Sequence, residues 1–187
     1  MTLKELKKEI SKPHNDFDQI PEELSGLFYE GIYAISIDIS TISECLLNCL
    51  KKNNKNKSVI YIGKANILLD RLLDELKAEG GFKGGIFFRK FGSYLNYICS
   101  EERCNHKSNY KFSYEDENSI KREIMLNLKL KTFQVSQRHE EELIQHFNPP
   151  FNHTHNKDEH GKNQMCEEVR QKHGKNYDLN KKYYGSK

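Results

Sequence analysis

The chain has no apolar run long enough to span a bilayer, and its lysine-rich N-terminus lacks the apolar core of a signal peptide. Both absences predict a soluble intracellular protein without a membrane partner, cytoplasmic in a prokaryotic or phage-like setting. An excess of charge of one sign is also missing, since 30 Lys and Arg face 27 Asp and Glu for a net charge of +3. This mildly basic balance permits a polyanion partner without requiring one.

Cysteine is sparse and odd in number, with five residues in the chain. Without an export signal, this count predicts reduced thiols and not a disulfide framework. Cys99, Cys104 and His106 suggest a zinc site, but four residues separate the two cysteines and no second close pair follows. Zinc at these three residues is therefore a minor alternative.

The length bounds the organisation, because 187 residues with 36% hydrophobic content build one core of ordinary domain size. We expect a helical arm and linker over residues 1–26, a central domain over 27–155, and a polar basic tail over 156–187. The tail is predicted either to clamp a nucleic acid or to be a solvated end, with a short helix near 166–173.

Hydrophobic periodicity in the central domain alternates between strand and helix patterns. It predicts strands over about 31–39, 58–62 and 128–136, and helices over about 66–78, 118–127 and 137–147. An additional helix is expected from Ile42 to Leu50 as an insertion. The fold class is therefore α/β, a small twisted sheet of at least three strands flanked by helices.

Two tripeptides lie in the first two predicted strands, Gly31-Ile32-Tyr33 and Tyr61-Ile62-Gly63. Each alone is ordinary strand sequence, and core tyrosines would explain both. After Gly63, which we expect to end its strand, a leucine-spaced helix carries Arg71 in its early turns. Arg71 lies on the flank of that helix, where either a solvated arginine or one directed into a cleft is compatible with the pattern.

Three consecutive glutamates begin the last predicted helix, and helical spacing distinguishes them. At roughly 100° per residue, Glu140 projects from the apolar stripe formed by Leu143, Ile144 and Phe147, whereas Glu142 points away from it. An acid on a buried stripe is unfavourable unless a cation accompanies it. Glu140 is therefore the candidate functional acid, and Glu141 and Glu142 are expected on the solvated surface of the helix. The alternative is that Glu140 merely caps the helix.

The order of the candidate residues resembles that of the GIY-YIG nuclease superfamily. Gly63 and Arg71 are eight residues apart, and Glu140 precedes Asn152 by twelve across a proline. The segment YIGKANILLDRL is especially similar to the excinuclease-type motif. The resemblance covers residues 30–153 and implies a mostly antiparallel GIY-YIG sheet with helical insertions. It implies that the tyrosines, Arg71 and Glu140 converge on one face of the sheet. It places these residues in the catalytic site: Tyr33, Tyr61, Lys64, Arg71, Glu140 and Asn152.

The implied chemistry is phosphodiester hydrolysis. Glu140 is a hard oxygen ligand suited to one Mg²⁺ or Mn²⁺ ion per site, and Arg71 is suited to bind phosphate. A tyrosine has an ordinary pKa of about 10, so a tyrosine base requires cationic surroundings such as Lys64. Tyr33 is the first choice for this base, and Tyr61 is the alternative. The resemblance gives Asn152 a supporting role, in which locking a turn and contacting substrate remain open.

The resemblance and the insertions together predict a metal-dependent DNA endonuclease of restriction or mobile-element type. The alternatives are a structure-specific DNA repair nuclease and a nucleic-acid-binding module that does not cut. Basic and aromatic residues interleave after the glycines at 80–85, so Arg89 and Lys90 are the candidate DNA-binding pair, unless this segment is a packing helix. A homodimer is an expected assembly for cutting both strands.

Overall fold

The computed structural model describes residues 1–16, 29–38, 40, 42–53, 58–77, 85–107, 109–156 and 165–186. These residues form two compact units. Unit 1 comprises Met1–Leu69 and Met125–Cys166, and unit 2 comprises Asp70–Ile124 and Glu167–Lys187. The division differs from the expected arm, central domain and tail. The N-terminal end of the chain belongs to unit 1, and the C-terminal end belongs to unit 2. The expected linker and the glycine-rich stretch lie largely outside the described residues.

Unit 1 is built on a four-stranded sheet with the order β1-β4-β2-β3. Its strands are β1 (Asn15–Asp16), β2 (Gly31–Ile37), β3 (Val59–Ala65) and β4 (Leu128–Phe133). Every pair of neighbours is antiparallel, which confirms the expected α/β class with an antiparallel sheet. Strand β3 forms one edge of this sheet, and β2 is buried along its whole length between β3 and β4.

Strand β3 continues beyond the point where we expected it to end. Gly63 pairs with Tyr33 of β2, and pairing continues through Lys64 to Ala65. The prediction that Gly63 ends the strand is therefore wrong. A register shift between Ile35 and Ser36 marks a bulge in the pairing of β2 with β3.

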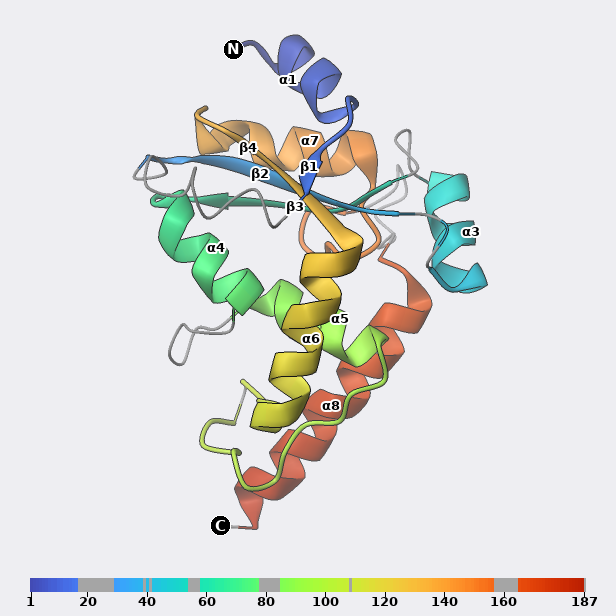
Figure 1. The fold of residues 1–187 in the computed structure, drawn as a ribbon, viewed down its shortest axis with the longest axis vertical. Coiled ribbons are helices and arrows are strands. Elements are labelled where there is room, and N and C mark those ends of the chain that lie inside the picture. Colours follow the sequence, from blue (N-terminus) through green and yellow to red (C-terminus); the bar gives the residue numbers. More distant parts are fainter. Residues whose placement is uncertain are drawn as a thin grey trace. The chain divides into compact units, whose positions relative to one another are not determined.

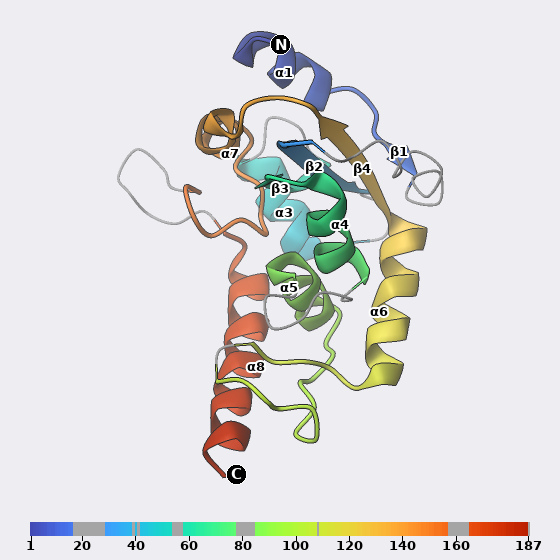
Figure 2. The same cartoon turned by 90° about the vertical axis from the view of Figure 1, so that its left-hand side faces the viewer.

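Two helices cover one face of this sheet, α1 (Leu3–Ile10) and α7 (Glu140–Phe147) (Figure 1, Figure 2). Helix α1 begins with a capping box, in which the Thr2 side chain accepts from Glu5 N–H and the Glu5 carboxylate accepts from Thr2 N–H. Buried apolar side chains of both helices share one core with β2 and β3. Its members on the helices are Leu6, Ile10, Leu143, Ile144 and Phe147, and its members on β2 and β3 are Ile32, Ala34, Val59 and Ile62.

A buried histidine connects α1 to this sheet. His14 Nε2 lies 2.9 Å from the carbonyl oxygen of Ile10, and its Nδ1 lies 3.0 Å from Ser36 Oγ. A neutral ring with its proton on Nε2 satisfies both contacts, because Nε2–H donates to the carbonyl and Ser36 O–H donates to Nδ1. Burial lowers the pKa of His14, the hydrogen bond to Ile10 opposes this, and the charge of Lys131 lowers it further.

The lowered pKa of His14 predicts that the contribution of this residue to the stability of unit 1 is lost in acid. Since its folded-state pKa lies below the unfolded value of about 6.5, the unfolded chain binds the proton more readily as the pH falls through that value. The stabilising effect of His14 is thus present at neutral pH and is lost in acid. The difference in urea midpoint between wild type and His14→Gln should shrink from pH 7.5 to pH 5, and a constant difference would contradict the prediction.

The first helical insertion is α3 (Glu44–Asn53) of unit 1. It lies between β2 and β3 and matches the helix expected after Ile42. Leu46 and Leu50 are fully buried and attach it to the unit. Helix α4 (Leu68–Lys77) follows β3, begins in unit 1 and continues in unit 2.

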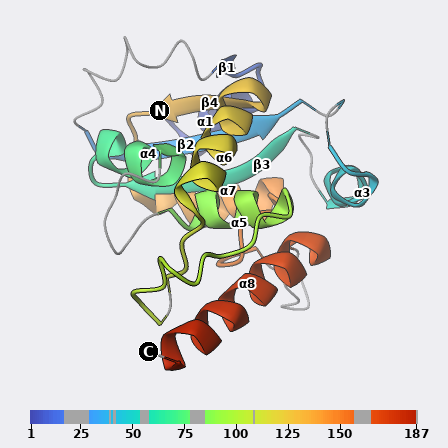
Figure 3. The ribbon, with the colours of Figure 1, turned by 60° about the horizontal axis from the view of Figure 1, so that its bottom comes forward.

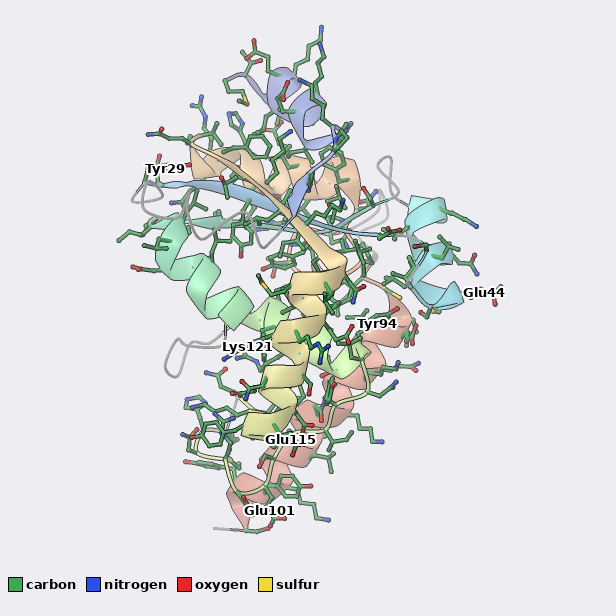
Figure 4. All side chains as sticks on the ribbon, viewed as in Figure 1. Tyr29, Glu44, Tyr94, Glu101, Glu115 and Lys121 are labelled. Carbon is green, nitrogen blue, oxygen red and sulfur yellow. The ribbon has the colours of Figure 1, made fainter. Side chains whose placement is uncertain are left out.

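Unit 2 contains most of α4 and α6 (Tyr114–Asn127), together with α5 (Ile86–Tyr94) and α8 (Glu167–Gly185). Helices α5 and α8 lie side by side (Figure 3). Tyr94, labelled in Figure 4, ends α5, and its carbonyl accepts from Lys172 of α8 at 2.9 Å. No helix in the described part of the chain combines the length and apolarity needed to cross a membrane.

Helix α8 replaces the expected polar tail, which we predicted to hold only a short helix. Its buried Asn176 donates to Ser93 Oγ and Tyr97 O, both at 2.8 Å, and accepts from Cys99 N–H at 2.8 Å. Hydrophobic periodicity did not predict the full length of this helix, because the residues that attach α8 within unit 2 include buried amides, which hydropathy counts as polar. The expected solvated end is therefore a packed helix over Glu167–Gly185.

Candidate active site

Tyr33 of β2 and Tyr61 of β3 lie side by side on one face of the sheet. Their ring centroids are 6.0 Å apart. Tyr33 is only 1% exposed, whereas Tyr61 is partly exposed. Burial therefore distinguishes two residues that the sequence left equivalent, because Tyr61 presents more of its surface to solvent.

Gly63 is required by the ring of Tyr33. A Cβ at this position would lie 2.4 Å from Cζ and 2.5 Å from Oη of Tyr33. Directly opposed residues in an antiparallel pair share a face, so the phenol of Tyr33 lies across the space that any larger residue at position 63 would fill. Gly31 is similarly crowded, since its Cβ would lie 2.3 Å from the Phe133 carbonyl oxygen. Gly63 thus permits the close approach of the Tyr33 ring, and Gly31 that of the Phe133 carbonyl.

Glu140 begins α7 and forms an ion pair with Lys64 of β3. Glu140 Oε2 lies 3.0 Å from Lys64 Nζ, with the glutamate side chain 14% exposed and the lysine side chain 45% exposed. Its neighbours Glu141 and Glu142 are exposed, as helical spacing predicted. The cation that a shielded glutamate requires is therefore Lys64, a pairing that no local pattern in the sequence indicates.

The candidate residues of unit 1 surround edge strand β3 and do not gather on one face. Side chains alternate along a strand, and Lys64 is opposite Ile32, whose side chain belongs to the core beneath α7. Tyr61 and Gly63 face the other side, together with Tyr33. Our expectation that tyrosines and Glu140 converge on one face is therefore wrong, because adjacent strand positions alternate between the two faces.

Asn152 holds the exposed edge of β3. Its Oδ1 accepts from Ile62 N–H at 2.9 Å, and its Nδ2 donates to the Ile62 carbonyl at 2.8 Å. An edge strand lacks a neighbour for these backbone groups, and the amide supplies both partners. Because Ile62 lies between Tyr61 and Gly63, Asn152 is a positioning residue, consistent with the turn-locking role.

The loop that carries Asn152 is fixed at several other points. Asn148 ends α7 in the left-handed region, with φ 45°, and its N–H donates to Ile144 O at 2.8 Å. Phe151 N–H donates to Ile60 O at 3.0 Å, which joins the loop to β3. The buried Asn156 donates to the Pro149 and Asn152 carbonyls at 2.8 and 3.0 Å.

We expect Asn152→Asp to destabilise unit 1 by about 1–3 kcal/mol, because a carboxylate cannot donate to the Ile62 carbonyl and leaves that group without its partner. The measurement is a urea unfolding curve of each protein at neutral pH. Asn148→Asp is a matched control, since Asp tolerates the left-handed region and the Asn148 backbone bond does not depend on its side chain. Equal losses in the two variants would contradict the proposed clamp.

The other predicted residues are placed as follows. Arg71 is a half-buried residue of α4 in unit 2, and its phosphate-binding role stays a prediction.

Helix α5 contains Arg89 and Lys90. Arg89 lies over the Tyr110 ring at 5.8 Å from its centroid, and Lys90 is 5% exposed. The burial of Lys90 leaves Arg89 as the more accessible candidate of the pair, and DNA contact by either remains a prediction.

The cysteines suggested for zinc have other contacts in unit 2. The Cys99 and Cys104 thiols each donate to a carbonyl of α8, those of Asn176 and Asn180, at 3.3 Å. Burial, assisted by nearby Cys104, raises the pKa of Cys99 to about 11, which favours a protonated thiol and not a metal-binding thiolate. In the described part of the chain, neither joins a three-ligand group with His106.

A divalent ion at Glu140 would have this carboxylate as its protein ligand. Among the described residues, Glu140 does not belong to a group of three His, Cys, Asp or Glu side chains. A single carboxylate fits Mg²⁺, because Mg²⁺ retains several of its waters and commonly uses one or two protein carboxylates. The donor set is therefore compatible with one hard ion per site.

A family model for the GIY-YIG catalytic domain matches residues 31–172, which is more than half of the chain. The chain belongs to the GIY-YIG family. No curated protein and no solved structure matches it at a significant level. The matched range contains all six predicted catalytic residues, so membership gives this GIY-YIG chain a nuclease domain with a nucleic acid substrate, of a kind that generally depends on divalent metal.

Proposed function

We propose that this GIY-YIG chain is a metal-dependent DNA endonuclease of restriction or mobile-element type. The observation that carries the proposal is the Lys64–Glu140 ion pair on edge strand β3, which also contains Tyr61. A shielded glutamate paired with a lysine provides negative charge for an ion and keeps that charge compensated until the ion binds. A bound divalent ion would polarise a phosphoryl oxygen and stabilise the leaving alkoxide.

Tyr61 is the residue that we assign to the attacking water. A general base must reach the proton that it removes, and Tyr61 is partly exposed whereas Tyr33 is buried. The Tyr61 phenolate oxygen would receive the water proton, which requires the scissile phosphate to lie at the edge of the sheet, where groups on both faces of β3 can reach it. Tyr33 would position Tyr61 through the contact between their rings, so burial reverses our first choice of base.

Arg71 is the predicted phosphate-binding residue of the family motif. Its planar guanidinium offers two parallel donors to a phosphate and compensates charge that develops during hydrolysis. The insertions favour a restriction or mobile-element enzyme. Helix α3 separates the two tyrosine tripeptides, and the part of unit 2 that follows Arg71 separates Arg71 from Glu140. Such additions provide surface for reading a sequence or wrapping a duplex.

The test of this function is digestion of unmethylated plasmid and phage DNA with Mg²⁺ or EDTA. Discrete fragments that require Mg²⁺ would support a sequence-specific endonuclease. Preference for branched over linear duplex would support a repair nuclease instead, and metal-independent binding without cleavage of any substrate would support a binding module.

Two conservative variants test the assignment of the base. Tyr61→Phe should lower the cleavage rate about 100-fold or more, since it removes the proton acceptor. Tyr33→Phe keeps the ring that contacts Tyr61 and should lower the rate less. The comparison uses single-turnover cleavage at saturating protein, with circular dichroism to check folding. Tyr61→Phe at wild-type rate, or the reverse order of effects, would refute the assignment.

A further inference from the structure

Three cysteines of unit 1, none of them a predicted nuclease residue, form a cluster. Cys45 and Cys49 lie in α3, and Cys166 is the last residue of unit 1. Their three sulfur atoms all lie within 4.8 Å of one another. Residues more than 100 positions apart in the sequence thus supply one group of soft ligands.

The local structure explains why the three thiols meet. Residues four apart on a helix share a face, so α3 presents Cys45 and Cys49 together. The buried side chains of Leu46 and Leu50 fix the orientation of that helix in unit 1. Cys166 is 1% exposed, and its N–H donates to the Pro150 carbonyl at 3.0 Å.

The backbone near Cys166 is connected in turn to the sheet. Phe151, which follows Pro150, donates its N–H to Ile60 of β3 at 3.0 Å. Cys166 is therefore held by a hydrogen-bonded path from the sheet, and α3 is held by its buried leucines. The three sulfur atoms are positioned by packed structure and not by an exposed loop, which reduces the ordering that a metal ion would have to impose.

We propose that Cys45, Cys49 and Cys166 bind one Zn²⁺ ion. Zinc–thiolate bonds are about 2.3 Å long, which puts sulfur atoms about 3.8 Å apart around a tetrahedral ion. The observed spread of at most 4.8 Å needs a contraction of about 1 Å or less, within reach of side-chain rotation.

The chemistry of the donors selects zinc over the hard ion expected at Glu140. Thiolates are soft ligands that prefer zinc to magnesium, whereas a carboxylate with waters suits magnesium. Binding converts three thiols to thiolates and releases three protons to the solvent. Cys45 lies in the first turn of α3, where the positive end of the helix dipole favours a negative ligand. Cys45 is also exposed, which leaves the fourth position of the ion open to water.

A bound zinc ion would join the helix inserted between β2 and β3 to the end of unit 1. Glu44, labelled in Figure 4, precedes the first ligand at the start of α3. The proposed role is structural: the ion links two segments of unit 1 that the sequence separates by the rest of the nuclease domain. Metal content reports on this site without a cleavage assay, so its failure and that of the proposed function are distinguishable.

The test is zinc retention by the purified full chain. Protein is reduced with a phosphine, incubated with Zn²⁺, freed of excess metal by gel filtration and analysed by mass spectrometry of the metal. We expect about one zinc per wild-type chain. Cys45→Ser and Cys49→Ser should each weaken binding roughly 100-fold or more, measured by competition with a chromophoric chelator. Cys104→Ser is the matched control, because Cys104 lies in unit 2 and should leave zinc binding unchanged.

Spectroscopy and stability provide a second measurement. Co²⁺ in place of Zn²⁺ should give a sulfur-to-metal charge-transfer band and the visible bands of a tetrahedral site, both weaker in Cys45→Ser. Removing zinc should lower Tm by about 5–10 °C in wild type and much less in Cys45→Ser. Cys45 is exposed, so its serine variant should remain folded. The proposal would be overturned if reduced wild type retained no zinc after gel filtration, or if Cys45→Ser bound zinc with wild-type affinity.

Discussion

Replacing Glu140 with glutamine should lower the rate of Mg²⁺-dependent DNA cleavage about 1,000-fold. Glutamine keeps the size of the side chain but removes the negative charge that would hold a hard ion, and interactions of this kind at phosphoryl-transfer sites contribute rate factors of about 10²–10³ or more. Lys64 is 45% exposed and remains hydrated when its partner is neutral. The variant should therefore fold normally and fail in catalysis.

The measurement is nicking of supercoiled plasmid under single-turnover conditions across a range of Mg²⁺ concentrations. Glu142→Gln is the matched control, because it makes the same chemical change on the exposed side of the same helix. It should cleave at nearly the wild-type rate. If both glutamine variants were equally impaired, helix charge and not an ion site would be the explanation. If Glu140→Gln were fully active, the proposed role of Glu140 would be excluded.

Substituting alanine for Gly63 should destabilise the protein by about 3 kcal/mol and greatly reduce its activity. The new methyl group would occupy the space of the Tyr33 phenol, 2.4 Å from its Cζ, in a sheet where β2 is buried along its length. Overpacking of a core typically costs 1–3 kcal/mol. Relief requires the Tyr33 ring to move, and this movement would disturb Tyr61 beside it.

Two comparisons make the Gly63→Ala prediction specific. Gly174→Ala in α8 should be neutral or stabilising by about 0.5–1 kcal/mol, because nothing lies within 4 Å of its Cβ and alanine is the better helix former. Gly63→Ala should also be less damaging in a Tyr33→Ala background, where the ring is absent, and a double-mutant cycle from urea unfolding measures that coupling. Additive effects would show that the ring of Tyr33 is not what excludes a side chain at position 63.

These expectations give the two glycines of the motif a physical role. Gly31 and Gly63 lie where a backbone carbonyl or a tyrosine ring approaches too closely for any Cβ. The glycines therefore act through packing and not through turn formation. Gly63 in particular couples the first tripeptide to the second, because the ring it accommodates belongs to Tyr33.

Much of this fold was predictable from local patterns. Alternation and apolar runs located β2, β3 and β4 to within a few residues, and helical spacing identified Glu140 as the shielded glutamate among three. These succeeded because burial on one face imposes a periodicity that the sequence must display. The exposed positions of Glu141 and Glu142 follow from the same geometry.

Other features depend on residues distant in sequence. Nothing near Lys64 indicates Glu140, and the amide of Asn152 reaches Ile62 across 90 positions. Helix α8 was underestimated because buried asparagines such as Asn176 carry no hydropathic signal. The spacing of Cys45 and Cys49 was visible in the sequence, but only the chain path adds Cys166.

The sequence by itself determined the family, the three long strands and the identities of the candidate catalytic residues, because order, spacing and periodicity are properties of the chain. Tertiary structure alone decided which of these residues pair, that those of unit 1 surround edge strand β3, and that Tyr33 is buried while Tyr61 is accessible. The physical reason is that strand register and helix docking set distances between residues far apart in the chain, and no local pattern contains those distances.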